Sequence, residues 1–385
     1  MTLDRQRVAA LRDCVQKTID EGRAPAAQFA LAQNGELLEF ETLGEANNSD
    51  RFCLFSATKP VVAALVWQLM GEGLLDLADR VTDVWPEFGA HGKHAITLEH
   101  VLLHMCGFPN ATIDQQHITT REARAAQMQD WTLQSEPGSR YEYHATSAHW
   151  VLTELVARVT GQDFRSALRT RVLDPLGVDR LEVGVPTERQ GDIKRCVITG
   201  EYGDLDALQE ILGVTVDASM LEAMLGDGVK YANDAELVEV GVPGASGISD
   251  AAQVALFYQG LLHNPDEIWR PKVLRKATGD ARDLPTNPLP DNPQTRRTVG
   301  LCVAGSDMRE LSLPSRPEPL STRLFGRLTS PRTFGHPGAG GQIAWADPES
   351  GLSFAFLTNG MDRDTFAGLE RDTTLSTLAA RCVKV

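Results

Sequence analysis

The sequence lacks the features that mark a membrane-bound, secreted or nucleic-acid-binding protein. No apolar run approaches the length of a membrane span, and the first residues show no basic stretch followed by an apolar one. We therefore expect neither a membrane helix nor a secretion signal. Positive charge is also in short supply, since 37 Lys and Arg face 52 Asp and Glu, for a formal net charge of -15. Phosphates and anionic lipid surfaces are bound by clustered cations, so the sequence argues against nucleic acid and membrane partners.

Cysteine pairs at metal-binding or redox spacing are missing as well. The sequence has six cysteines, none of them in a Cys-x-x-Cys pattern. They are Cys14, Cys53, Cys106, Cys196, Cys302 and Cys382. Scattered cysteines of this kind are typical of reduced, mostly buried thiols, so we expect a cytoplasmic protein.

The composition itself is that of an ordinary globular protein, with 42% hydrophobic and 23% charged residues among 385. Apolar residues recur on one helical face between positions 3 and 21, which predicts an N-terminal helix. Two strand-like runs follow at 26–32 and 37–43, joined by Asn34-Gly35. An Asn-Gly pair between two such runs is the strongest short-range signal for a β-hairpin.

The far end of the chain repeats this pattern. Residues 342–347 and 352–357 predict a second hairpin, and residues 364–380 predict a closing helix. Helices and hairpins therefore occupy both ends of the chain. The simplest arrangement is a sheet assembled from both ends, with helices packed on it.

The middle of the chain differs from the ends, because most of it is predicted to be helical. The expected helices cover residues 61–70, 98–104, 147–159, 164–172 and 250–262. Residues 283–335 are rich in Pro, Arg and Ser and show little periodicity. Long irregular segments in compact proteins often rim binding sites.

Ser56 and Lys59 form the one Ser-x-x-Lys pattern of the sequence. Residues three apart on a helix share a face, so the Lys59 amine can come close to the Ser56 hydroxyl. A serine hydroxyl is a poor nucleophile until a base takes its proton. A lysine is such a base once burial and nearby cations lower its pKa toward neutrality. The alternative is a capping serine beside a solvated lysine, and the pattern alone favours that alternative.

The segment after Lys59 changes this balance. Residues 61–70 are almost wholly apolar, and a helix that is apolar all round is buried in the centre of a protein. Lys59 therefore enters a buried helix, where an unpaired ammonium is costly. A purely structural lysine belongs on a wetted face, so the context favours a catalytic pair.

At these residues the chain resembles the serine β-lactamase-like superfamily, which includes class C β-lactamases, DD-peptidases and family VIII carboxylesterases. The resemblance starts at residues 55–59 and continues through 71–81. Residues 96–107 are similar to the family segment Ile-Thr-x-x-x-Leu-Leu-x-His-Thr-Ser-Gly, with Met105 and Cys106 in place of Thr and Ser. The resemblance covers most of the chain and is strongest toward the esterase-like members.

A second matching segment contains Tyr143 at the tyrosine of the family's Tyr-x-Asn motif. In that family the tyrosine hydroxyl shares proton transfer with the lysine. A phenol near an ammonium has a depressed pKa, so we expect Tyr143 to be able to accept a proton. Tyr141 competes for the position, but the spacing from Pro137-Gly138 favours Tyr143. Ala145 stands where the family has Asn, which weakens the case for β-lactam turnover.

A third matching segment is Phe334–Gly341, with His336 at the first position of the family's Lys-Thr-Gly or His-x-Gly motif. The resemblance implies that the backbone N–H groups of Ser56 and Ala339 form an oxyanion hole, and that His336 and Gly338 also line the site. Taken alone, the segment is a glycine-rich turn with a partly exposed His336. A histidine is mostly neutral at pH 7, unlike a lysine that would bind a substrate carboxylate, so His336 favours uncharged esters.

The resemblance implies an α+β fold of the β-lactamase/DD-peptidase type. We expect an antiparallel sheet built from both chain ends, flanked by helices, with a mainly helical subdomain. Residues 1–385 would form a single catalytic domain. Its α/β region would cover about 1–55 and 296–385, and its mainly helical region about 56–295.

The sequence therefore predicts a serine hydrolase that forms an acyl-enzyme on Ser56, with Lys59 and Tyr143 managing the proton. The leading hypothesis is a carboxylesterase acting on small uncharged esters. A β-lactamase or D-amino-acid peptidase is the first alternative, against which Ala145 and His336 count. An acyltransferase and a non-catalytic binding or assembly protein on the same scaffold also stay open. The expected partner is a small ester or other acyl substrate, and a homo-oligomer is compatible with the sequence.

No cofactor or metal is expected. Four histidines cluster in sequence and could suggest ligands: His91, His94, His100 and His104. No acidic residue completes a His-Glu-x-x-His pattern among them. Ser246 is read as structural, because it lacks the Gly-x-Ser-x-Gly frame of an α/β-hydrolase nucleophile.

Overall fold

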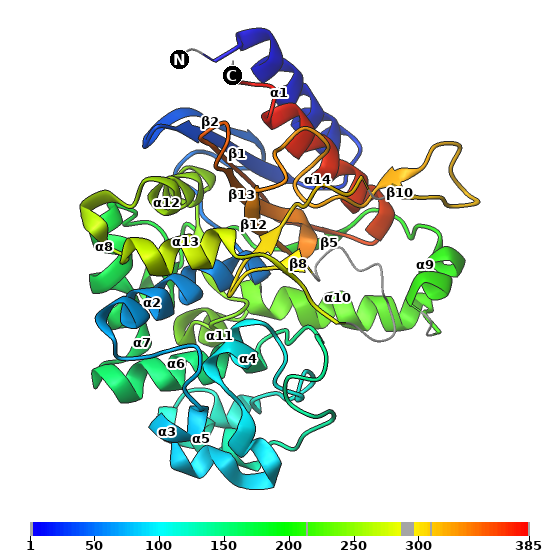
Figure 1. Cartoon of the computed structure of the whole chain (residues 1–385). Helices are drawn as coiled ribbons and strands as arrows, with labels where there is room; N and C mark the ends of the chain where they lie inside the picture. Colours follow the sequence, from blue (N-terminus) through cyan, green and yellow to red (C-terminus); the bar gives the residue numbers. More distant parts are fainter. Residues whose placement is uncertain (1–2, 213–214, 286–295, 309, 384–385) are drawn as a thin grey trace.

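The computed structural model describes residues 3–212, 215–285, 296–308 and 310–383. Its centre is an antiparallel sheet of eight strands, as drawn in Figure 1. In the order in which they pair, the strands are β2 (Glu36–Gly44), β1 (Ala26–Gln33), β14 (Leu352–Thr358), β13 (Gln342–Asp347), β12 (Phe334–Gly338), β9 (Cys302–Val303), β8 (Arg296–Arg297) and β7 (Arg282–Asp283). The two chain ends meet where β1 pairs with β14. The predicted sheet from both ends of the chain is confirmed.

The first hairpin forms where the sequence places it. Asn34 and Gly35 have φ angles of 57° and 80°. Both angles lie in the left-handed region, where asparagine and glycine are the residues best tolerated. The strands on either side of this turn are β1 and β2, which pair along their whole length with one irregularity between Leu31 and Ala32.

Alternate side chains of β1 lie on opposite faces of the sheet and belong to two different hydrophobic cores. Phe29 and Leu31 pack in a cluster with Val8, Leu11 and other residues of the terminal helices. The alternating neighbours on β1 pack instead in the larger core of the helical region. Successive residues of a strand point to opposite faces, so one strand seals both cores.

The terminal helices α1 (Arg5–Asp20) and α14 (Thr365–Ala379) lie side by side on one face of the sheet (Figure 1). Asp4 and Asp364 cap their N-termini, since each carboxylate accepts from backbone N–H groups in the first turn. The two chain ends are also joined by a bridge between Leu3 and Val383.

The other face of the sheet carries α12, and the remaining helices extend below it in Figure 1. Between the terminal helices, the described residues form α2 (Lys59–Glu72), α3 (Val81–Val84), α4 (Leu98–Leu102), α5 (Arg121–Asp130), α6 (Ser147–Thr160), α7 (Phe164–Leu168), α8 (Asp174–Leu176), α9 (Leu205–Leu212), α10 (Ala218–Asn233), α11 (Ala235–Val240), α12 (Ala251–His263) and α13 (Pro271–Gly279). Helix α2 is buried almost all round, as its apolar sequence predicts. The sequence did not predict α10, which contains two glycines.

Among the described residues, three small sheets accompany the central one. They are β3-β6-β4 (Phe52–Cys53, Gly247–Ser249 and Glu182–Val183), β15-β5 (Gly360–Asp362 and Val197–Thr199) and β10-β11 (Glu310–Leu311 and Leu320–Ser321). The first of them matters for function, because β3 leads directly into the segment that carries Ser56.

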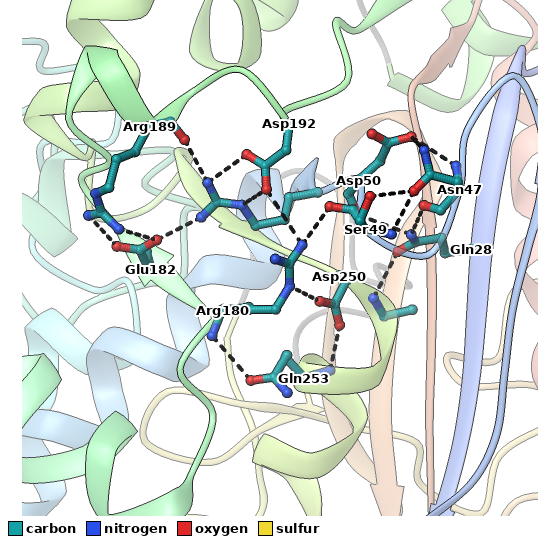
Figure 2. A network of polar contacts seen from close by, with 12 residues as sticks. Gln28, Asn47, Ser49, Asp50, Arg180, Glu182, Arg189, Asp192, Asp250 and Gln253 are labelled. Carbon is teal, nitrogen blue, oxygen red and sulfur yellow. Dashed lines mark hydrogen bonds and ion pairs between the residues drawn. The ribbon is translucent and has the colours of Figure 1, made fainter.

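A network of ion pairs holds the chain in place just before β3, as Figure 2 shows. The buried guanidinium of Arg51 donates to Glu182 at 2.6 Å and to Asp192 at 2.8 Å. Arg180 joins the network by donating to Asp250, the residue that caps α12. Charged pairs with several hydrogen bonds hold their partners in one geometry. The network therefore fixes β3 relative to α12 just ahead of Ser56.

In the part of the chain that the structure describes, no helix is both long and apolar enough to cross a membrane. The six cysteines are free, and five of them are buried, as expected for reduced thiols.

Candidate active site

Ser56 lies in a single 3₁₀ turn, η1 (Phe55–Thr58), that runs straight into α2. Phe55 just before it has a φ of 45°. A left-handed conformation is strained for an aromatic residue and persists only where the surrounding structure imposes it. Such strain is concentrated at functional sites, and here it sets the direction of Ser56 as the chain leaves β3 for the helix.

Lys59, the first residue of α2, is completely buried and points at Ser56. Its Nζ lies 3.0 Å from Ser56 Oγ, 2.8 Å from the carbonyl oxygen of Ala145 and 2.8 Å from that of Gly244. Carbonyl oxygens can only accept. The two carbonyls therefore take two N–H groups, and the third tetrahedral direction of the nitrogen faces the serine hydroxyl.

The surroundings of Lys59 favour its neutral form. Burial lowers the pKa of Lys59 well below its ordinary value, and the positive charge of Arg297 lowers it further. Among the described residues, no carboxylate is one of the groups that shift this pKa. A neutral amine here has a lone pair directed at Ser56, which is the arrangement that a general base requires.

Gly244 is needed for this geometry. A Cβ at this position would come within 2.9 Å of the Ala145 carbonyl oxygen and 3.3 Å of Lys59 Nζ. Only a residue without a side chain lets the 244 backbone approach the amine so closely. From the sequence, the segment around Ser246 was interpreted as structural, and no role was expected for Gly244. Ser246 itself is buried, and its hydroxyl donates to the Tyr231 carbonyl at 3.0 Å, in agreement with a structural role.

Tyr143, and not Tyr141, lies beside the pair. The ring of Tyr143 is 4.8 Å from Lys59 Nζ, and its hydroxyl is hydrogen-bonded to the Ser56 side chain. Tyr141 is buried behind it, against the guanidinium of Arg297. The spacing argument that selected Tyr143 therefore agrees with the position of both rings.

The expected depression of the Tyr143 pKa was wrong. Its pKa is raised, not depressed, because burial outweighs the hydrogen bond with Ser56 and the charge of Arg297, which both act in the opposite direction. The expectation assumed a neighbouring ammonium, whereas the lysine beside it is driven toward the neutral amine. At neutral pH Tyr143 is a protonated phenol, and it is therefore a proton donor.

The third predicted segment forms β12 and closes the site from the sheet side. A Cβ on Gly338 would come within 2.4 Å of the Leu54 carbonyl oxygen and 3.2 Å of the Ala57 nitrogen. The end of β12 thus lies directly against the backbone on both sides of Ser56. Ala339 follows directly in sequence and is exposed. Ser56, Gly338 and Ala339 are brought together as the resemblance implied.

His336 is buried, which contradicts the interpretation of this segment as a turn with a partly exposed histidine. Its Nδ1 lies 2.6 Å from the Pro337 carbonyl oxygen, and its Nε2 lies 3.3 Å from Nη2 of Arg297. An arginine can only donate, so Nε2 must accept and the ring proton must be on Nδ1. Burial, and then the charges of Arg297 and Lys59, lower the pKa of His336 well below its ordinary value. His336 is therefore a neutral imidazole in one fixed tautomer.

Arg297 is a charged residue of the site to which no sequence motif points. It lies in β8, is fully buried, and donates through Nη1 to Cys302 Sγ at 3.1 Å. Its charge acts on Lys59, Tyr143 and His336 alike. Arg297 falls in the irregular stretch 283–335, where no periodicity or motif distinguishes one arginine from another. Only the pairing of β8 with β9 beside β12 brings it to the site.

A layer of buried histidines lies behind Tyr143. The ring of His104 is 4.9 Å from that of Tyr143 and 5.8 Å from that of His149, and its Nδ1 accepts from the backbone N–H of His144 at 3.2 Å. Burial holds the pKa of His104 and His149 well below the ordinary value, with Arg297 and Lys59 acting in the same direction. The layer is polar but uncharged, so it does not stabilise an ammonium on Lys59.

The histidines considered as metal ligands do not come together. His100 accepts at Nδ1 from the Thr97 backbone at the start of α4, whereas His104 faces Tyr143. Over the described ranges, no group of three or more His, Cys, Asp or Glu side chains is arranged to hold a metal ion.

The comparisons with known proteins identify the family. The beta-lactamase family model matches residues 11–379, so the chain belongs to the beta-lactamase family. It is 27% identical over 316 residues to the esterase/beta-lactamase LipL of Mycobacterium tuberculosis, covering 80% of this chain and 68% of that protein. These relationships establish a serine hydrolase of this superfamily.

Two solved structures show the same fold over nearly the whole chain. One is a penicillin-binding protein homologue from Caulobacter crescentus, with 25% identity and a TM-score of 0.75, covering 100% of this chain and 99% of that one. The other is a family VIII carboxylesterase, with 22% identity and a TM-score of 0.74, covering 96% of this chain and 97% of that one. The predicted α+β fold of the β-lactamase/DD-peptidase type is confirmed.

Proposed function

We propose that the chain is a carboxylesterase that hydrolyses uncharged esters through an acyl-enzyme on Ser56. The observation that carries the proposal is the placement of Lys59: a buried amine whose two N–H groups are taken by carbonyls and whose third direction meets Ser56 Oγ at 3.0 Å. A nucleophile and its base within hydrogen-bond reach are the minimum that acyl transfer needs.

In the first step, Ser56 Oγ attacks the ester carbonyl carbon and its proton passes to Lys59 Nζ. The carbonyl oxygen becomes an oxyanion facing the backbone N–H groups of Ser56 and Ala339. Oriented backbone donors of this kind typically contribute a few kcal/mol to the stability of the transition state. The new ammonium keeps its hydrogen bonds to the Ala145 and Gly244 carbonyls, so it needs no side-chain rearrangement.

In the second step, the C–O bond to the leaving alcohol breaks, and the departing alkoxide takes a proton. Tyr143 is a protonated phenol beside both Ser56 and Lys59, so it donates that proton and regains one from the lysine. Water then attacks the acyl-enzyme by the reverse sequence of proton transfers. The carboxylic acid leaves, and Ser56 is restored.

The ester preference rests on two residues. A neutral His336 gives a substrate carboxylate no charge partner at the position where β-lactamases have lysine, and Ala145 offers no side-chain amide to an acylamino group. The one relative quoted above that carries both names, the esterase/beta-lactamase LipL, makes β-lactam hydrolysis the alternative to test. Free cysteines in the described chain support, as a further proposal, a cytoplasmic location.

The direct test is to label the protein with a fluorophosphonate and map the label by mass spectrometry, then to compare p-nitrophenyl acetate with nitrocefin. We expect the label on Ser56 and faster turnover of the ester. Absence of a label on Ser56 would favour a non-catalytic protein. Faster turnover of nitrocefin would overturn the ester preference, and transfer to added methanol in preference to water would indicate an acyltransferase.

The pH dependence of the activity should depend on Arg297. Lys59 must be unprotonated to act as a base, so activity falls as the pH drops below the Lys59 pKa. Burial is the main cause of that low pKa and Arg297 is the next, so Arg297→Gln should raise the pKa. We expect the acid limb of the kcat/KM profile to move upward by about one pH unit.

Arg297→Lys is the matched control for this experiment, since it keeps the charge while changing the geometry. The upward shift of its acid limb should be at most about half of the shift in Arg297→Gln, because a positive charge in nearly the same place still lowers the pKa of Lys59. Thermal unfolding of both variants checks that they are folded. An unmoved acid limb in a folded Arg297→Gln variant would contradict the role given to this residue.

A further inference from the structure

Tyr143 lies in a stretch that has no regular secondary structure of its own. Residues 142–144 are neither helix nor strand, and α6 begins only at Ser147. A proton donor must stay within hydrogen-bond reach of the atom that takes the proton, and a displacement of about 1 Å can cost about 100-fold in rate. Contacts with another part of the chain must therefore hold Tyr143 in place.

His104 makes such contacts on both sides of Tyr143. The carbonyl oxygen of His104 accepts from the backbone N–H of Glu142 at 3.1 Å, and its imidazole Nδ1 accepts from the backbone N–H of His144 at 3.2 Å. The His104 ring also lies against the Tyr143 ring, with centroids 4.9 Å apart and an angle of 33° between the planes. A single residue therefore holds the backbone before and after Tyr143 and packs on the side chain between them.

The backbone of His104 has an unusual conformation. Its φ is 57°, two residues after the end of α4, and the residue is buried. The left-handed region is unfavourable for a residue with a Cβ, and glycine or asparagine is usual there. A residue stays in this region where the surrounding structure imposes it, most often at functional sites. In this conformation, the carbonyl and the ring of His104 both reach the segment 142–144.

The His104 ring can accept a hydrogen bond from His144 only while it is neutral. Because Nδ1 accepts, the ring proton is on Nε2. Burial, and then the charge of Arg297, lower the pKa of His104 well below its ordinary value. A protonated ring would donate from both nitrogens and would lose the bond to His144. At neutral pH His104 therefore remains an acceptor.

We propose that His104 is a positioning residue for Tyr143, which it holds where the phenol can donate a proton to the departing alcohol. The inference rests on the proposed esterase function and adds a residue to it. His104 acts through Tyr143 and exchanges no proton with the substrate. Its effect must therefore appear wherever the reaction depends on the proton of Tyr143.

Two kinds of leaving group separate this role from a purely structural one. An alkoxide needs a proton in order to leave, whereas p-nitrophenolate is stable enough to leave without one. Ethyl acetate and p-nitrophenyl acetate give the same acetyl-enzyme, so a difference between them in kcat/KM arises before the alcohol has left. A variant that only loses folded protein slows both esters equally.

The test measures kcat/KM for both acetates in the wild-type protein and in variants of Tyr143 and His104. Tyr143→Phe has no phenolic proton, so the ratio of the ethyl to the p-nitrophenyl value should fall by about 100-fold. His104→Gly suits the left-handed backbone but lacks the ring and its acceptor, so the ratio should fall by about tenfold.

His104→Asn is the conservative variant that should rescue the reaction. Asparagine tolerates the left-handed backbone, and its side-chain oxygen can take the place of Nδ1 as acceptor for the His144 N–H. The ratio should therefore stay within about threefold of the wild-type ratio, since the hydrogen bond is kept. His104→Gln carries its oxygen near the position of Nε2 instead, and it replaces His104→Gly in the comparison if that variant does not fold.

Met128→Ala is the control for lost stability. Met128 lies on α5 and is buried in the core of the helical region. Its truncation leaves a cavity that lowers the free energy of unfolding, but the ratio of the two acetates should not change. Thermal unfolding measures the stability of each variant, and titration with a fluorophosphonate gives the concentration of active protein.

Two results would overturn the proposal. One is an equal fall for both acetates in His104→Gly, or in His104→Gln where it takes that place. The other is a fall in the ratio for His104→Asn as large as for that variant, because the bond to His144 would then not matter. An unchanged ratio in Tyr143→Phe would refute the role of Tyr143 and this proposal with it. Failure of the esterase function looks different, since neither acetate is hydrolysed and Ser56 takes no label.

Discussion

Replacement of Ser56 by alanine is expected to abolish turnover of p-nitrophenyl esters, with a loss in kcat/KM of about 10,000-fold or more. The variant keeps the backbone N–H groups of the proposed oxyanion hole but has no atom to form the acyl-enzyme. Residual activity can then come only from binding and from the oriented backbone donors, which accelerate attack by water weakly. Steady-state kinetics at saturating and limiting ester concentrations measure the loss.

A second serine supplies the control for that experiment. Ser246 is buried, and its hydroxyl donates to a backbone carbonyl, so Ser246→Ala should change stability slightly and leave kcat nearly unaltered. Equal losses in the two variants would show that the effect is structural. An active Ser56→Ala variant would remove Ser56 as the nucleophile and with it the proposed mechanism.

The second large effect is expected at Lys59. Lys59→Met replaces the amine with an apolar side chain of similar length, so no general base faces Ser56 and kcat/KM should fall by about 1,000-fold. The rate of fluorophosphonate labelling at Ser56 should fall in parallel, because that reaction also needs the serine proton to be removed. Both rates are measured at the pH optimum of the wild-type protein.

Lys59→Arg separates basicity from hydrogen bonding. An arginine can still donate to the carbonyls of Ala145 and Gly244, but it does not lose its proton in the accessible pH range. We therefore expect it to be as inactive as Lys59→Met at every pH from 6 to about 10. Full activity in either variant would assign the proton transfer to another group, and Tyr143 would be the first to examine.

Much of the fold could be predicted from local patterns. The Asn34-Gly35 turn, the two terminal hairpins and the buried α2 all follow from side-chain periodicity and turn chemistry, which depend on near neighbours in sequence. Helix α10 could not be predicted in the same way. Its two glycines disfavour a helix, and several of its apolar side chains, such as Met220 and Met224, are exposed, so neither propensity nor periodicity marks it clearly.

The residues of the site also fall into those that sequence motifs predict and those that only the structure shows. The sequence brought forward Ser56, Lys59, Tyr143, His336, Gly338 and Ala339, and the structure places these residues around one centre. The sequence did not predict the roles of Arg297 or of the Ala145 and Gly244 carbonyls, because no sequence motif marks a buried charge or a backbone carbonyl. The same reason accounts for the wrong expectation about the Tyr143 pKa, since that pKa is set mainly by how deeply the ring is buried.

The sequence alone thus determined the family, the order of the three motifs and the identity of the nucleophile and base candidates. Those features reside in short stretches, where residue type and spacing fix local geometry. Only the tertiary structure decided that Lys59 is held toward the neutral form and that His336 is a neutral acceptor for Arg297. Burial, electrostatic fields and cavities arise from residues far apart in the chain, so they exist only once β8, β12 and α10 are assembled around Ser56.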